Sequence, residues 1–114
     1  MDLIAFYKDI GGNFSKTEKN LVSRDIIEEL VIDFLEDTSF DTLINGITNG
    51  NIETAFIGAH TLKGVSGSLG FDCLTDLAVS ITEKLRNKII PSPDEISKAE
   101  KEYRRIIDAI NRYK

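Results

Sequence analysis

One histidine of this sequence has neighbours that suit chemistry on its ring. His60 is the only histidine among the 114 residues, and Lys63 follows it about three-quarters of a helical turn later. A neutral imidazole nitrogen is a nucleophile near pH 7, so imidazole can accept a phosphoryl group and then donate it. Lys63 would place a mobile cation beside a dianion on the ring, although it could also be an ordinary solvated surface charge. These residues could form a phosphoryl acceptor at His60 that is supported by Lys63, although a lone histidine on a helix is more often an incidental surface residue.

Two glycines follow the histidine on the same face of its expected helix. Glycine inside a helix costs about 0.8–1.0 kcal/mol relative to alanine, and Gly64 and Gly67 lie one and two turns beyond His60. Their small size would keep the imidazole clear and let another protein approach the helix backbone. We therefore predict that Gly64 supports the phosphate site and that Gly67 and Ile57 contact a partner. Close packing between helices would also explain Gly67, and Ile57 could be an ordinary exposed apolar residue.

The helix that carries these residues is predicted from its caps and from the spacing of its apolar side chains. Asn51 is a plausible N-cap and Gly70 a left-handed stop, so the helix should run to Leu69. At about 100° per residue, one side of this helix collects the residues expected to face the core: Ile52, Ala55, Phe56, Ala59, Leu62, Ser66 and Leu69. His60 projects about 125° away from the centre of that stripe. Its ring should therefore be accessible to solvent.

The rest of the chain is predicted to be helical as well. Apolar residues recur at three-and-four spacing almost throughout, and no alternating run indicates a strand. The first expected elements are a short amphipathic helix over residues 3–10, stopped by Gly11-Gly12, and a polar stretch over 13–20 with weak helical character. A helix capped by Ser23 follows, with Ile27, Leu30, Val31, Phe34 and Leu35 facing inward, and then a short helix that is capped by Thr38 or Ser39 and ends at Asn49-Gly50. Asp72 opens another helix, and the capping box Ser92-Pro93-Asp94-Glu95 opens the last one.

Helices that are apolar on one side only must pack against each other to be stable. Because the connections are short, we predict an all-α fold, an antiparallel up-down-up-down four-helix bundle with a short extra N-terminal helix. A chain of this length forms one domain. We expect residues 1–20 to form the N-terminal helix and its lead-in, and residues 21–114 to form the bundle.

Composition limits the partners and cofactors of the protein. The net charge of −5 and the sequence pI near 4.8 argue against nucleic acid. No apolar run approaches the roughly 20 residues that span a bilayer, and the N-terminus lacks the basic region of a signal peptide. The single Cys73 cannot form an internal disulfide and is expected to fill a small space in the core. We expect a cytoplasmic monomer without a metal, a cofactor or a membrane partner.

The segment from Ala59 to Gly70, Ala-His-Thr-Leu-Lys-Gly-Val-Ser-Gly-Ser-Leu-Gly, resembles the phosphorylation motif of histidine-containing phosphotransfer (HPt) domains. In that motif His-x-Leu-Lys-Gly is followed by Leu-Gly. A Phe-Leu-Glu-Asp run at Phe34–Asp37 and a Leu-x-x-Leu-Ala run at Leu74–Ala78 are also common in the family. The resemblance covers the chain from about Leu21 to its end.

The resemblance implies a phosphohistidine intermediate at Nε2 of His60 and exchange with an aspartate of a response-regulator receiver domain. A hybrid or other sensor histidine kinase is implied upstream. The chain has no glycine-rich loop for ATP and no set of carboxylates for Mg²⁺. We therefore expect a phosphoryl carrier rather than an enzyme, with the catalytic machinery and its metal in the partners.

Two alternatives remain open. The chain could be the phosphoacceptor module of a chemotaxis-type histidine kinase, cut from a longer polypeptide, or a degenerate module that binds a receiver without transfer. A start at Met1 and a bundle that closes by Tyr113 favour a free-standing protein, while the intact motif at His60 favours transfer. An enzyme acting on a small molecule is disfavoured because a four-helix core of this size leaves little room for a pocket.

Overall fold

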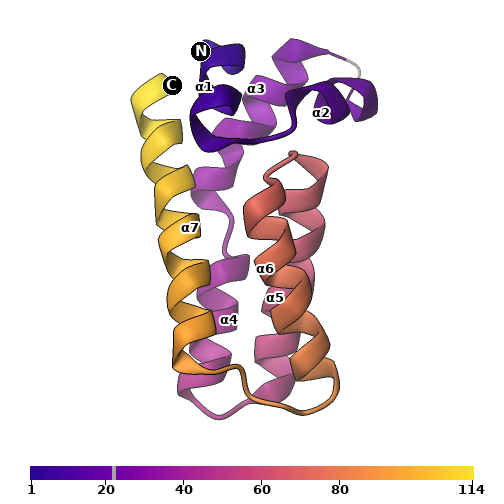
Figure 1. Ribbon diagram of the computed structural model, residues 1–114, viewed down its shortest axis with the longest axis vertical. Coiled ribbons are helices and arrows are strands. Elements are labelled where there is room, and N and C mark those ends of the chain that lie inside the picture. Colours follow the sequence, from indigo (N-terminus) through magenta and orange to yellow (C-terminus); the bar gives the residue numbers. More distant parts are fainter. Residues whose placement is uncertain (22) are drawn as a thin grey trace.

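The computed structural model describes residues 1–21 and 23–114, and nearly all of this part of the chain is helical. The elements in order are α1 (Leu3–Ile10), α2 (Phe14–Asn20), α3 (Arg24–Asp33), the 3₁₀ turn η1 (Phe34–Glu36), α4 (Ser39–Thr48), α5 (Ile52–Ser68), α6 (Asp72–Arg86) and α7 (Pro93–Tyr113) (Figure 1). No strand occurs among the described residues, which confirms the all-α prediction. None of their helices is long and apolar enough to cross a bilayer.

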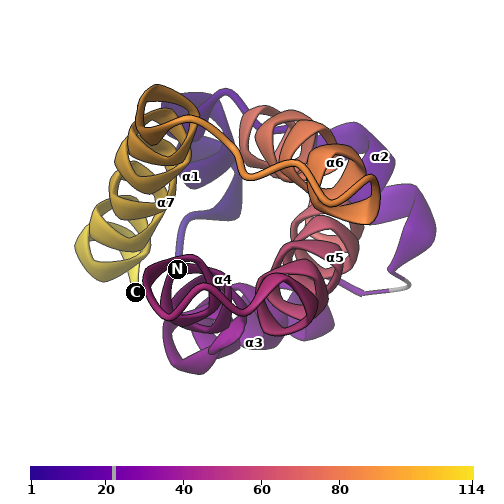
Figure 2. The ribbon, with the colours of Figure 1, turned by 90° about the horizontal axis from the view of Figure 1, so that it is seen from below.

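Four columns of helix form the predicted antiparallel bundle. In Figure 1, α4 runs downward, α5 upward, α6 downward and α7 upward, with α3 and η1 extending the α4 column at the upper end. Figure 2 looks along the bundle and shows α4, α5, α6 and α7 around a common centre. The N-terminal part contains two helices rather than the single one expected, because the polar stretch after Gly12 forms α2.

Local capping chemistry sets the boundaries of the helices. Asn51 Oδ1 accepts a hydrogen bond from Thr54 N at 3.0 Å, and Ser92 Oγ accepts one from Glu95 N at 3.2 Å. Gly70 adopts a φ of 71° just after α5, as its predicted role requires. These three boundaries are confirmed to within about a residue.

The prediction for the start of α4 needs a correction. Thr38 occupies the N-cap position, but its side chain makes no capping hydrogen bond. Asp37 Oδ2 instead accepts a hydrogen bond from Ser39 N at 3.0 Å. The cap therefore comes from the residue before the expected pair, because a carboxylate can reach the free N–H groups of the first turn.

A chain of aromatic rings crosses the core and connects the helices. Phe40 stacks on Tyr103 at 4.4 Å between ring centroids, and Tyr103 meets Phe34 edge to face at 5.9 Å. Phe34 contacts Phe71 at 5.3 Å, and Phe71 contacts Phe6 of α1 at 6.1 Å. Edge-to-face and offset contacts at these distances stabilise a core beyond the area that they bury. The N-terminal helix is therefore part of the same core as the bundle.

Two residues that were expected in the core lie at the surface. Leu30 is 38% exposed, because the buried stripe of α3 runs through Ile27 and Val31. Cys73 is exposed, since the inward side of α6 begins at the neighbouring Leu74. Successive helical residues differ by about 100° in direction, so one position decides whether a side chain is buried or exposed.

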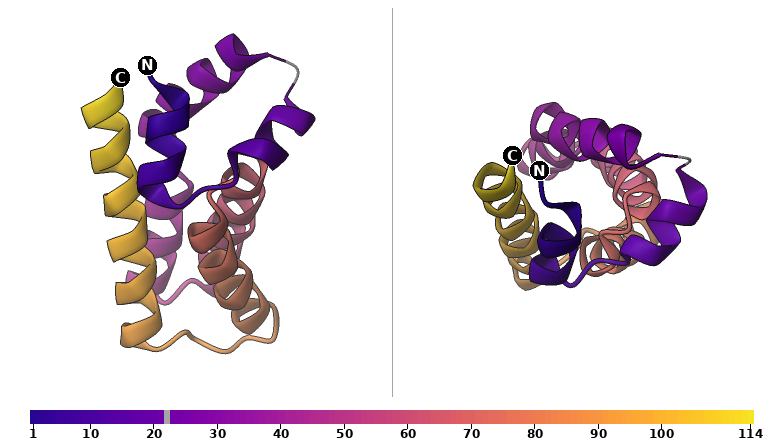
Figure 3. Two further views of the ribbon diagram at one scale, coloured as in Figure 1. Left: turned by 45° about the horizontal axis from the view of Figure 1, so that its top comes forward. Right: turned by 90° about the horizontal axis from the view of Figure 1, so that it is seen from above.

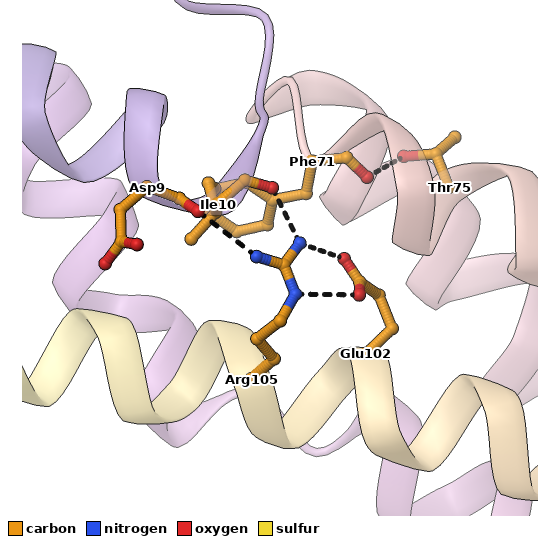
Figure 4. Close-up of polar contacts among 6 residues, drawn as sticks. All are labelled: Asp9, Ile10, Phe71, Thr75, Glu102 and Arg105. Carbon is orange, nitrogen blue, oxygen red and sulfur yellow. Dashed lines mark hydrogen bonds and ion pairs between the residues drawn. The ribbon is translucent and has the colours of Figure 1, made fainter.

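Two arginines of α7 hold the end of α1: Arg112 pairs with the Asp9 carboxylate at 2.6 Å, and Arg105 binds main-chain carbonyls (Figure 4). Arg105 Nη2 donates to Ile10 O at 2.6 Å and Nη1 to Asp9 O at 3.3 Å, so the guanidinium satisfies carbonyls that the helix end leaves free. Glu102 holds the same guanidinium through Nε at 3.0 Å and Nη2 at 2.6 Å. Figure 3 shows α1 beside the C-terminal end of α7, with both termini at this end of the bundle.

Candidate functional site

His60 lies in the middle of α5 on the side that faces away from the core. Its side chain is exposed, as the helical spacing predicts, whereas the neighbouring Ala59 and Leu62 are fully buried. The residues of α5 expected to face inward are buried or half-buried in every case. The bundle therefore presents the only imidazole of the chain to solvent from a rigid helix.

Lys63 and Gly64 follow His60 on adjacent positions of the helix surface. Lys63 is half-buried and lies three residues beyond the histidine, a spacing at which side chains on a helix are neighbours. Gly64 is exposed, and a Cβ added to it would meet no atom within 4 Å. Packing inside the chain therefore gives no reason for glycine at position 64.

Gly67 also has room for a side chain. A Cβ added to it would lie 3.6 Å from Thr75 Cγ2 of α6, which is an ordinary van der Waals contact. Close packing between α5 and α6 was one of two explanations for this glycine, and the structure does not support it. Packing against α6 therefore does not require glycine at position 67.

Phe56, which the sequence analysis did not assign to the site, lies next to His60, and Arg86 lies next to Phe56. The Phe56 ring stacks on the imidazole at 5.6 Å between centroids, with 10° between the planes. Arg86 of α6 places its Cζ 5.1 Å from the centroid of the Phe56 ring, and its Nε donates to Glu83 Oε1 at 3.2 Å. Phe56 was expected in the core stripe; it is half-buried and packs against the core, and its ring also contacts the exposed His60.

A signal for Phe56 was present in the sequence, but one for Arg86 was not. An aromatic residue four positions before a histidine on a helix lies directly beside it. Arg86 contacts Phe56 from another helix, so its position depends on the rotation of α6 about its own axis. Lys84, another cation near the end of α6, is directed elsewhere and pairs with Glu95 of α7.

Helix α5 is held from both sides by polar and close contacts. Toward α6, Ser66 Oγ donates to Leu62 O at 2.7 Å, and Thr75 Oγ1 lies 2.9 Å from Ser66 Oγ. The same Thr75 hydroxyl lies 3.0 Å from Phe71 O (Figure 4). Toward α4, a Cβ added to Gly58 would lie 2.3 Å from Leu43 N, so the two backbones nearly touch. The helix that carries His60 therefore has a fixed register against both neighbours.

An open hollow of about 470 Å³ lies beside the site between α5 and the end of α6. Its lining residues are Ile52, Glu53, Phe56, Ile57, Leu85, Arg86 and Lys88. Ile57 is 60% exposed at this surface, as a partner contact requires. No group of three or more His, Cys, Asp or Glu side chains in the described part of the chain is placed to hold a metal ion. The arrangement offers an accessible nucleophile and nearby cations on an open surface.

Comparison with known proteins places this site in a family. The family model of the Hpt domain matches residues 25–113, which include α4 to α7 and His60. No significant match was found among curated proteins or among solved structures. Hpt domains act in histidine phosphotransfer in two-component signalling, and they are phosphocarrier modules rather than kinases. Because the match covers well over half of its length, the chain belongs to the Hpt domain family.

Proposed function

We propose that the protein is a phosphoryl carrier of a two-component phosphorelay, with His60 accepting the phosphoryl group from a receiver-domain aspartate and donating it to another. The observation that carries this proposal is the exposure of the only histidine in the chain, midway along α5 and inside the matched Hpt segment. Residues 21–114 would form the transfer bundle, with residues 1–20 covering one end.

The transfer step follows from the chemistry of imidazole. The lone pair of His60 Nε2 attacks the phosphorus of an aspartyl phosphate, so the N–P bond forms as the P–O bond to the aspartate breaks. The electron pair of that bond returns to the carboxylate, and the Nδ1 proton passes to water. The transition state is loose, so positioning and charge neutralisation dominate the catalysis. Lys63 would neutralise charge on the carrier, while the receiver would supply the metal.

The surface around His60 would receive the partner. Gly64 and Gly67 carry no side chain in a place where the chain itself leaves room for one. Ile57 adds exposed apolar area on the other side of the histidine, which suits the core of a protein interface. A receiver domain that docks over these residues could bring its aspartate to the imidazole. A hybrid or other sensor kinase would provide the first phosphorylated receiver.

The test is phosphoryl transfer from ³²P-labelled receiver domains to the wild type and to His60→Gln. We expect acid-labile, base-stable label on the wild type only, with an almost unchanged melting temperature in the variant because the ring lies outside the core. A large loss of stability in His60→Gln would contradict the exposed position of the ring.

The other outcomes distinguish the alternatives. Binding to receivers without transfer from any of them would indicate a degenerate receiver-binding module. Labelling by the ATP-binding domain of a histidine kinase, with none from receivers, would indicate the phosphoacceptor module of a kinase.

A further inference from the structure

The exposed imidazole of His60 forms a stack with two further side chains, one from its own helix and one from α6. The Phe56 ring lies nearly parallel to the His60 ring with 5.6 Å between centroids, and the guanidinium of Arg86 lies over the Phe56 ring. Phe56 is half-buried and packs against the core, whereas His60 and Arg86 are exposed. The stack therefore connects the exposed histidine to a side chain that the bundle holds in place.

We propose that Phe56, held by Arg86, is a positioning residue that sets the orientation of the His60 imidazole for phosphoryl transfer. This proposal rests on the proposed role of His60 as phosphoacceptor. It assigns Phe56 and Arg86 no contact with the phosphoryl group itself. Their effect would reach the reaction only through the direction of the imidazole ring.

The geometry of the stack leaves the nucleophile free. The lone pairs of the imidazole nitrogens lie in the plane of the ring and point outward from its edge. The Phe56 ring is nearly parallel to the imidazole and offset from it, because its centroid lies 5.6 Å away rather than at the roughly 3.5–4 Å of full face-to-face contact, so it does not enclose the edge of the imidazole. Phe56 can therefore restrict the ring without blocking the attack of a nitrogen on phosphorus.

Restriction of the ring matters because the histidine is otherwise exposed. Exposed side chains change rotamer on the picosecond to nanosecond timescale, and phosphoryl transfer depends mainly on the positioning of the reacting groups. A ring that is already stacked has less orientational freedom to lose when the receiver arrives. The expected gain is in the rate of transfer within the complex.

Arg86 stabilises the position of Phe56 from the second helix. A guanidinium over an aromatic face is attracted by the ring and stacks on it in a way that a lysine ammonium does not. The exposed ion pair of Arg86 with Glu83 keeps the guanidinium on the α6 surface, although such a pair adds little stability of its own. The contact couples Phe56 to α6 as well as to α5.

The experiment compares Phe56→Leu, Phe56→Tyr and Arg86→Met with the wild type. The transfer rate at saturating phosphorylated receiver should fall by about three- to tenfold in Phe56→Leu, with an unchanged half-saturating receiver concentration. Phe56→Tyr should restore the rate, and Arg86→Met should give a smaller loss. In proton NMR spectra of the unphosphorylated protein, the chemical shifts of the His60 ring protons should change in Phe56→Leu, since the ring current of Phe56 is lost.

A matched control exists at the other end of the bundle. Phe14 of α2 has Tyr7 as an aromatic neighbour at 5.0 Å and Arg24 Cζ at 5.3 Å from its ring centroid. Phe14→Leu should therefore cost comparable stability and leave the transfer rate at saturation unchanged. An equal loss of rate in Phe14→Leu would show that stability, not orientation, causes the effect.

The proposal and the assigned function can fail separately. Wild-type transfer together with a wild-type rate in Phe56→Leu would overturn the positioning role and leave the carrier function intact. Absence of transfer by the wild type would overturn the carrier function, and with it any positioning role in transfer. Unshifted His60 ring protons in Phe56→Leu would show that the stack does not persist in solution.

Discussion

The two sides of α5 use glycine for opposite purposes. Gly58 is buried, and a Cβ there would lie 2.3 Å from Leu43 N and 2.8 Å from Ser39 O, which are both backbone atoms of α4. Gly64, six residues later, is exposed and has empty space where its Cβ would be. One glycine lets two helices of the same chain approach, while the other leaves a surface open beside His60.

This contrast separates glycines that the packing of the chain requires from one that it does not require. Gly46 of α4 repeats the buried situation, since its Cβ would lie 2.3 Å from Ala55 N. Gly58 and Gly46 thus let each helix lie against the other's backbone. Nothing within the chain demands glycine at position 64, although a helix loses about 0.8–1.0 kcal/mol by having one. The proposed function would account for that loss, since a receiver domain docked over His60 would have to come close.

The largest effect on stability is expected from Gly58→Ala. The added methyl group would meet backbone atoms that cannot rotate away, so α4 and α5 would have to separate. We expect the free energy of unfolding to fall by about 2 kcal/mol, the overpacking cost less the gain in helix propensity. Urea denaturation followed by circular dichroism measures this loss. An unchanged midpoint would show that the two helices are less close than the structure indicates.

The second prediction concerns Gly64→Gln on the exposed side. The longer side chain would crowd the imidazole and the docking surface without touching the core, so transfer from a phosphorylated receiver should fall at least about tenfold, or 1.4 kcal/mol. The melting temperature should not decrease. Asn111→Gln, on the exposed side of α7, places the same side chain away from the site and should transfer normally. A wild-type transfer rate in Gly64→Gln would remove the argument that position 64 must be small.

Sequence patterns predicted those features of the molecule that depend on local chemistry. The caps at Asn51 and Ser92 and the left-handed Gly70 follow from the needs of helix ends. The exposure of His60 follows from helical periodicity alone. These features could be predicted because each depends on residues within one or two turns of the chain.

Features that depend on how two helices meet could not be predicted in this way. Gly58 and Gly64 look alike in the sequence, and only the path of α4 shows that one of them is essential to packing. Arg86 reaches Phe56 because of the rotation of α6, which no pattern within α6 determines. Cys73 was misplaced for the same reason, since a single position on the helix surface decides between core and solvent.

The third prediction concerns the buried end of α5, where Tyr7 Oη donates to Leu69 O at 2.7 Å. Burial raises the pKa of Tyr7 from 10.0 to about 12. Between pH 10 and pH 12 the phenol therefore keeps its proton in the folded chain and loses it in the unfolded chain. The stability due to this group is fully present below pH 10 and is lost as the pH rises toward 12. Tyr7→Phe should cost about 1 kcal/mol at neutral pH and make unfolding less sensitive to pH above 10. If Tyr7→Phe loses stability just as steeply above pH 10, this loss must come from other groups, such as Tyr103, whose pKa is also raised by burial.

The smallest effect, and the most direct test of the contrast within α5, is expected from Gly64→Ala. Its methyl group would meet no atom within 4 Å, so the helix should gain the propensity of alanine and the protein about 0.5–1 kcal/mol of stability. Transfer should fall less than in Gly64→Gln, since a methyl group occupies less of the docking surface than the glutamine side chain does. Thermal denaturation of Gly64→Ala and Gly58→Ala side by side should show shifts of opposite sign from the same substitution on one helix. Shifts of the same sign would mean that the two glycines do not differ in the way their surroundings indicate.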